Sequence, residues 1–170
     1  LMGIDFTVCA VDVDEHVEGH PEQAVQLLAQ RKAEAAYKAH PGCTVLGADT
    51  LVYCDGATLG KPRDEADALG MLRRLSGRMN TVYTGVCVID GATGSKQVRC
   101  DRAEVHFVTL DDDAAMRYIK TGEPMDKAGA YGVQGMGGMF VSSIQGSPSN
   151  VIGLPMHVVR EMLRSIGWKL

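Results

Sequence analysis

The chain has 170 residues, of which 45% are hydrophobic, and its formal net charge at pH 7 is −4. That length and apolar content suit a single globular domain with a sizeable core, whereas the acidic balance argues against binding of long nucleic acids, which usually needs a basic face. No apolar run approaches the roughly 20 residues that span a bilayer, so no membrane segment is predicted. The five cysteines form no C-x-x-C pair, and we expect reduced thiols in a cytoplasmic protein.

Strands and helices predicted from hydrophobic patterns alternate along most of the chain. In chain order they are strand 6–15, helix 21–40, strand 43–54, helix 63–77, strands 80–90 and 96–110, helix 111–122, strand 139–146 and helix 154–167. Pro21 suits the first position of its helix, Asp64 can cap the next helix, and the pair Asp55-Gly56 indicates a turn. Residues 122–138 form a long glycine-rich loop, of a kind that usually has a function. The order of elements predicts an α/β fold with a mixed, twisted sheet flanked by helices.

Carboxylates end or interrupt the first two predicted strands. Asp14 and Glu15 end the first strand, and Asp49 lies inside the apolar run VLGADTLV, where a carboxylate needs a partner. If the two strands are neighbours, Glu15 and Asp49 can share one Mg²⁺ or Mn²⁺ ion, because oxygen ligands suit these cations. Alternatively, Asp14 and Glu15 are solvated charges at the end of a strand.

Two lysines stand in unusual positions. Lys32 lies in the apolar stripe of helix 21–40, so it either extends its ammonium group to solvent or meets an anion at the edge of the sheet. Lys61 follows a glycine, but the string GATLGKP fails the P-loop pattern, because Pro62 replaces the serine or threonine that would hold a metal. Carboxylates and lysines together indicate metal-assisted chemistry on a phosphate ester or anhydride.

Eight strings of the sequence carry a resemblance to a known family. They are VDVDEH, RKAEAA, VLGADTLV, LGKP, LSGR, YTGV, YIKTGEPMDKAGAYGVQGMGG and GSPSNVIGLP. They occur in the order seen in the Maf family of nucleoside triphosphate pyrophosphatases, from about Val11 to Pro155. The resemblance implies one domain over residues 1–170, with a central cleft and a fold shared in outline with the inosine triphosphate pyrophosphatases.

The same resemblance implies a reaction and the residues that perform it. The family hydrolyses a nucleoside triphosphate to the monophosphate and pyrophosphate with a divalent cation, here Mg²⁺ or Mn²⁺. Asp49 matches the family's proton acceptor and Glu15 matches an acidic active-site position, so both are expected to hold the cation. Lys32 and Lys61 match the lysines that contact the phosphates.

The base preference is implied by two further positions, Thr50 and Gln134. The strings ADT and AYGVQG, which contain them, are similar to those of the subgroup that acts on dTTP and UTP. The amide of Gln134 can both donate to and accept from the edge of a pyrimidine. Alternatively, Gln134 is a polar loop residue whose side chain bonds to the backbone.

The resemblance also implies a cellular role, a homodimer and one departure from the family pattern. The family removes noncanonical nucleotides in a house-cleaning role and is linked to septum formation in bacteria. Its N-terminal S-x-S-P-R-R segment has no match in this sequence, and we expect the domain to lack its native N-terminal segment. Two alternatives to the dTTP and UTP pyrophosphatase therefore stay open: a nucleotide-binding regulator without turnover, and a 7-methyl-GTP pyrophosphatase of the same family.

Overall fold

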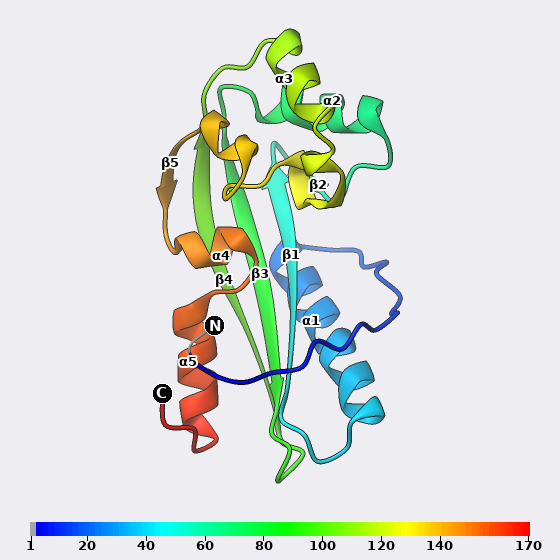
Figure 1. The fold of residues 1–170 in the computed structure, drawn as a ribbon, viewed down its shortest axis with the longest axis vertical. Helices are drawn as coiled ribbons and strands as arrows, with labels where there is room; N and C mark the ends of the chain where they lie inside the picture. The colour runs from blue at the N-terminus through cyan, green and yellow to red at the C-terminus, as the bar shows by residue number, and fades with distance from the viewer. Residues whose placement is uncertain (1–2) are drawn as a thin grey trace. The chain divides into compact units, whose positions relative to one another are not determined.

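A computed structural model of the chain describes residues 3–170 and shows an α/β protein (Figure 1). The helices are α1 (Pro21–Ala39), α2 (Glu65–Leu75), α3 (Asp112–Ile119), α4 (Pro148–Ile152) and α5 (Met156–Ser165). The strands are β1 (Val45–Cys54), β2 (Ala57–Leu59), β3 (Met79–Ile89), β4 (Lys96–Phe107) and β5 (Val141–Gln145). Short 3₁₀ helices lie between α3 and β5: η1 (Glu123–Asp126), η2 (Ala128–Ala130) and η3 (Met136–Phe140). The predicted α/β class is confirmed.

The strands form a five-stranded sheet in the order β2-β1-β3-β4-β5. β1 and β2 make a hairpin in which Cys54 pairs with Ala57 across Asp55 and Gly56, and both turn residues have positive φ. This turn is the one that the Asp55-Gly56 pair predicts. β3 and β4 follow each other in the chain and are neighbours in the sheet, as predicted, and β4 pairs antiparallel with β5.

The strand predicted at 6–15 is wrong. Residues 4–18 form neither helix nor strand, and the side chains of Phe6 and Val8 are 66% and 82% exposed. A valine-rich alternating stretch becomes a strand only where a neighbour accepts its backbone hydrogen bonds and covers its apolar face. The sheet described above includes no such neighbour for it. Asp14 and Glu15 therefore lie in an irregular segment and not at the end of a strand.

The predicted helices all form, within a few residues of their expected bounds. α2 begins as expected, because the carboxylate of Asp64 accepts a hydrogen bond of 2.8 Å from the backbone amide of Asp67. β2 and α4, with three and five residues, were not predicted, because elements this short do not show a full period of hydrophobic pattern. No helix within residues 3–170 combines the length and the apolar character needed to cross a membrane.

The described chain divides into two compact units. Unit 1 comprises the described residues up to Asp49, together with Gly85–Cys100 and Met156–Leu170, and unit 2 comprises Thr50–Thr84 and Asp101–Pro155. The division passes through β1, β3 and β4, so each of these strands contributes residues to both units. That the chain forms one domain over residues 1–170 stays a prediction.

In unit 1, α1 packs directly on the backbone of two strands at glycines. A Cβ added to Gly47 of β1 would lie 2.6 Å from the carbonyl oxygen of Ala29 and 2.7 Å from the nitrogen of Ala33. A Cβ added to Gly85 of β3 would overlap the carbonyl group of Val25. Only glycines at these two positions let the backbone of the helix approach the strands so closely.

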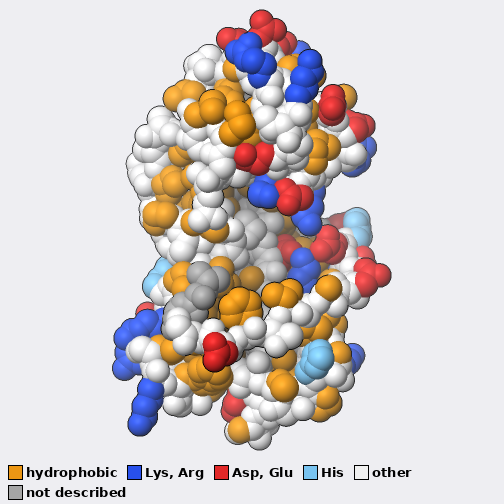
Figure 2. Space-filling model, viewed as in Figure 1, with side chains coloured by type: hydrophobic (Ala, Val, Ile, Leu, Met, Phe, Trp, Pro, Cys, Tyr) orange, Lys and Arg blue, Asp and Glu red, His pale blue; other side chains and the backbone are white. Residues whose placement is uncertain are grey.

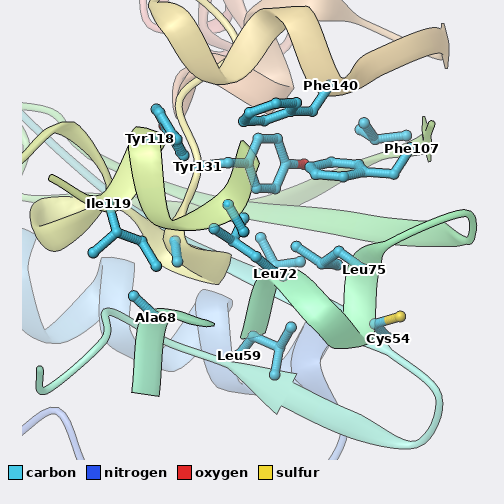
Figure 3. Packing of buried hydrophobic residues seen from close by; sticks show 14 of the residues in the cluster. Cys54, Leu59, Ala68, Leu72, Leu75, Phe107, Tyr118, Ile119, Tyr131 and Phe140 are labelled. Atoms are coloured by element: carbon cyan, nitrogen blue, oxygen red, sulfur yellow. The ribbon is translucent and has the colours of Figure 1, made fainter. Parts of the chain in front are cut away.

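In unit 2, the core is built around aromatic side chains (Figure 3). The rings of Phe107 and Tyr131 lie edge to face with centroids 4.8 Å apart, and those of Tyr118 and Phe140 are arranged similarly at 5.3 Å. Leu72 of α2 is fully buried beneath them. This core ties α2, α3 and the loop that follows α3 into one unit.

The glycine-rich loop is fixed by a carboxylate. Glu123 accepts hydrogen bonds from the amides of Met136 at 2.8 Å and Gly137 at 3.1 Å, and from the Tyr118 hydroxyl at 2.9 Å. The Tyr118 oxygen in turn accepts a bond of 3.1 Å from the amide of Gly132. Burial raises the pKa of Glu123, but these hydrogen bonds outweigh it and hold the pKa below its ordinary value. The loop is therefore an ordered structure, built on an ionised side chain.

Replacing Gly47 by alanine tests the packing of α1 on β1. We expect Gly47→Ala to lower the free energy of unfolding by about 1–3 kcal/mol, because the new methyl group meets the helix backbone. Gly70→Ala is the matched control, since nothing lies near that position in α2 and the change should stabilise the protein by up to about 1 kcal/mol. Urea unfolding at pH 7 measures both, and equal effects of the two substitutions would contradict the packing described here.

The Glu123 anchor gives a pH-dependent prediction. Because the folded pKa lies below the unfolded one, the carboxylate contributes stability above pH 4.5, and that stability is lost as the pH falls through the folded pKa. Glu123→Gln should lower the free energy of unfolding by about 1–2 kcal/mol at pH 7, and the difference from wild type should shrink towards pH 3. Glu65→Gln, which removes an exposed carboxylate, should change it by less than about 0.5 kcal/mol. A Glu123→Gln effect that is constant from pH 7 to pH 3 would show that the charge does not matter.

Candidate functional site

Three of the predicted site residues meet in unit 1. The ammonium nitrogen of Lys32 lies 2.5 Å from Oδ1 of Asp49 and 2.9 Å from Oε1 of Glu15. The side chain of Asp49 is 12% exposed and that of Lys32 is 25% exposed, whereas the Glu15 side chain is 61% exposed. Two carboxylates from different segments therefore converge on one partly buried cation, and the interpretation that Lys32 extends to solvent is wrong.

The position of Asp49 follows from the packing of α1 on β1. Gly47 and Asp49 are two residues apart on the strand, so their side-chain positions lie on the same face of the sheet. That face is the one α1 covers, because Gly47 lies against Ala29 and Ala33. Lys32 immediately precedes Ala33 on the helix, and it reaches Asp49 from there. The carboxylate inside an apolar run thus has its partner on the neighbouring helix.

The position of Glu15 depends on Arg31, a residue that the sequence did not point out as part of the site. Its guanidinium group donates hydrogen bonds to the carbonyl oxygens of Asp14 at 2.6 Å and His16 at 3.2 Å. These bonds hold the irregular segment on either side of Glu15 against α1. Arg31 and Lys32 are adjacent, so one helix turn fixes the backbone near Glu15 and binds its carboxylate. The only signal in the sequence is that Arg31 belongs to the string RKAEAA.

The electrostatics keep Lys32 charged. Burial lowers the pKa of its ammonium group, but hydrogen bonds to Asp49 and Glu15 outweigh burial and raise the pKa above its ordinary value. Two carboxylates and one ammonium leave the cluster with a formal charge of −1. The cluster is therefore suited to accept further positive charge.

The donors of this cluster fit a hard divalent cation. Carboxylate oxygens are the ligands that Mg²⁺ and Mn²⁺ prefer, and Asp49 and Glu15 already place oxygen atoms around a single positive group. Within the described residues, no cluster of three or more histidine, cysteine, aspartate or glutamate side chains forms a closed metal cage. A magnesium site that uses two carboxylates together with substrate phosphates needs no such cage.

Thr50 begins the part of β1 that belongs to unit 2, and its surroundings differ from those of Asp49. Its hydroxyl lies 2.9 Å from the hydroxyl of Thr84 on β3, and Thr84 in turn lies 2.9 Å from the carbonyl oxygen of Asn150. Thr84 and Asn150 are completely buried, and Thr50 is half-buried. These partners are 34 and 66 residues apart in sequence, and neither was predicted to take part in the site.

Lys61 and Gln134 also belong to unit 2, and both are exposed. Lys61 follows Gly60, whose carbonyl oxygen accepts a hydrogen bond of 2.9 Å from the amide of Gly129 in the glycine-rich loop. Gln134 lies in the same loop, between residues that Glu123 and Tyr118 hold. Among the residues described, no hydrogen bond joins either side chain to Thr50, so unit 2 does not form a closed cluster like that around Lys32.

The face of the molecule shown in Figure 2 carries charged side chains of both signs. On the face shown in Figure 2, acidic and basic side chains are interspersed, and no continuous basic surface lies on that face. Several of the basic groups are paired with carboxylates, as Arg73 is with Asp112 and Arg99 with Glu161. An extended phosphate backbone needs a row of cations that are not already neutralised.

Comparison with known proteins assigns the sequence to a family. A family model described as Maf-like protein matches residues 1–166. A dTTP/UTP pyrophosphatase of Pelotomaculum thermopropionicum is 43% identical over 99% of this chain and 90% of its own length. Proteins of the same name from Thermococcus gammatolerans and Moorella thermoacetica are each 46% identical over 98% of this chain, and over 88% and 87% of their own lengths. The chain belongs to the Maf family.

Proposed function

We propose that this chain hydrolyses nucleoside triphosphates, with UTP and dTTP as substrates, to the monophosphate and pyrophosphate. The observation that carries the proposal is the convergence of Asp49 and Glu15 on Lys32, because a triphosphate needs both a bound cation and a base that activates water. The relatives named dTTP/UTP pyrophosphatase support the same reaction and the same bases. Water adds to one phosphorus of the α–β anhydride and the bond from that phosphorus to the bridging oxygen breaks, which gives the monophosphate and pyrophosphate.

Asp49 is proposed as the group that takes the proton from the attacking water. A base must be ionised, and the Lys32 ammonium at 2.5 Å favours the ionised form of Asp49. Lys32 also fixes the direction of the Asp49 carboxylate. The lysine itself is fixed because it belongs to α1 and its ammonium group binds Glu15. Position and charge of the base are therefore set before the substrate binds.

Asp49 and Glu15 are also the proposed ligands of a divalent cation, Mg²⁺ or Mn²⁺. When bound, the cation neutralises part of the negative charge of the triphosphate and so lowers the cost of bringing another anion or lone pair to the phosphorus. Lys61 is proposed to contact the phosphates, as an exposed cation on a segment that is bonded to the glycine-rich loop. Its charge is most effective on the oxygens that gain charge in the transition state.

Thr50 and Gln134 are proposed to contact the base. The amide of Gln134 can donate to a carbonyl group of uracil or thymine, and the anchored loop fixes the backbone that carries this amide. From the family assignment we also propose a house-cleaning role in the cytoplasm and a homodimer. Light scattering at micromolar concentration measures the oligomeric state.

The carboxylate of Asp49 is tested by Asp49→Asn. We expect kcat/KM for UTP to fall by about 100-fold or more, because the amide cannot take a proton, while circular dichroism shows the fold intact. Asp12→Asn, which removes an exposed carboxylate near the segment of Glu15, should leave the rate unchanged. EDTA should stop wild-type turnover and added Mg²⁺ should restore it. Binding of UTP by calorimetry without formation of UMP in the wild type would instead support a regulator.

The base contact of Gln134 is tested by Gln134→Glu. A carboxylate only accepts hydrogen bonds, so it disfavours the carbonyl-rich edge of uracil and favours the donor-rich edge of a guanine. The ratio of kcat/KM for UTP to that for 7-methyl-GTP should fall by about tenfold or more. Gln145→Glu, at an exposed position on β5, is the matched control and should leave the ratio unchanged. An unchanged ratio in Gln134→Glu would remove Gln134 from the base site.

A further inference from the structure

Three groups of unit 2 form a directed chain of hydrogen bonds that begins at Thr50. The Thr50 and Thr84 hydroxyl oxygens are 2.9 Å apart, and the Thr84 oxygen is 2.9 Å from the carbonyl oxygen of Asn150. That carbonyl also accepts a hydrogen bond of 2.9 Å from the amide of Gly153. The chain therefore ends on a backbone oxygen, which can only accept.

Counting protons fixes the direction of both hydroxyl groups. A carbonyl oxygen and a hydroxyl oxygen at 2.9 Å need a proton between them, and only the single proton of Thr84 can occupy that place. Thr84 then has no proton left for Thr50, so the proton in the second contact comes from Thr50. Thr50 donates to Thr84, and the remaining capacity of its oxygen is that of an acceptor.

The end of this chain is rigid, so the direction is not easily reversed. Asn150 is completely buried and its side-chain amide donates a hydrogen bond of 2.9 Å to the carbonyl oxygen of Val82 on β3, two residues before Thr84. A Cβ added to Gly153 would lie 3.4 Å from the Thr50 hydroxyl oxygen, so the segment after α4 lies beside that oxygen. The acceptor is thus held in place from β3 and from the segment after α4.

We propose that Thr84 and the Asn150 carbonyl make Thr50 a hydrogen-bond acceptor that selects a base with an N–H at position 3. This rests on the proposed function, in which Thr50 contacts the base. Uracil and thymine have a single ring N–H on their pairing edge, N3–H, which lies between two carbonyl groups. Cytosine presents a bare N3 there, and two acceptors facing each other disfavour binding. Thr84 is a positioning residue, because it acts on the base through Thr50.

Removing the Thr84 hydroxyl should reverse this selection. In Thr84→Val the Thr50 proton loses its acceptor and becomes available to the bare N3 of cytosine. We expect the ratio of kcat/KM for UTP to that for CTP to fall by about tenfold or more, mainly through KM, since the base is remote from the reacting phosphorus. Calorimetry measures the dissociation constants of the two triphosphates, and we expect the preference for binding UTP over CTP to fall by a similar factor. Thr84→Ser keeps the hydroxyl and should restore the wild-type ratio.

A double-mutant cycle separates this effect from a loss of packing. In Thr50→Val the acceptor is gone, so adding Thr84→Val should not change the UTP to CTP ratio further. Equal effects of Thr84→Val with and without Thr50, or an unchanged ratio in folded Thr84→Val, would overturn the proposal while turnover of UTP by the wild type still stands. Absence of wild-type turnover would instead overturn the proposed function. The ratio of the dissociation constants for UTP and CTP would then test whether Thr84 positions the Thr50 hydroxyl. If Thr84→Val does not fold, Thr84→Ala gives the same comparison.

Discussion

The structure depends most on the direct contact between α1 and the backbone of β1 at Gly47. A glycine on the strand and alanines on the helix bring the two backbones so close that no side chain fits between them. Because the side chains of a strand alternate, this contact also sets the face and the height at which Asp49 stands. Lys32 then spans the remaining distance, and Glu15 joins it from a segment that Arg31 holds on the same helix. One steric constraint thus produces an ionic cluster.

The sequence was sufficient for those parts of the fold and site that depend on local pattern. The run VLGADTLV revealed a carboxylate that needed a partner, and the helical stripe revealed Lys32 as a lysine that either extends to solvent or meets an anion, but only the structure joins the two residues. The segment at 6–15 has the pattern of a strand but no neighbour, and whether a neighbour exists is not a local property. Thr84 and Asn150 were not predicted as site residues for a related reason, because buried polar residues far apart in sequence show no spacing that links them.

The two units use different physical means around the candidate site residues. In unit 1 the contacts are between full charges, which act over a distance and tolerate small shifts of a mobile phosphate group. In unit 2 the contacts of Thr50 are between neutral groups, whose strength depends on direction and on which atom holds the proton. Charges suit a triphosphate, which all nucleoside triphosphates share, and directed hydrogen bonds suit a base, which distinguishes one nucleoside triphosphate from another. Asp49, which makes contacts between charges, and Thr50, which makes neutral hydrogen bonds, are consecutive residues of β1.

The packing of the glycine-rich loop against Glu123 and Tyr118 restricts where this loop can vary. Side chains at Gly135 and Gly137 would overlap Glu123 and the Tyr118 hydroxyl, respectively, whereas Gln134 between Val133 and Gly135 is exposed. The two glycine positions are therefore restricted by their neighbours, whereas position 134 is open to substitution. A library that aims to change the range of accepted bases should randomise codon 134 and keep Gly135 and Gly137, because side chains at these glycines would disrupt the fold of the loop.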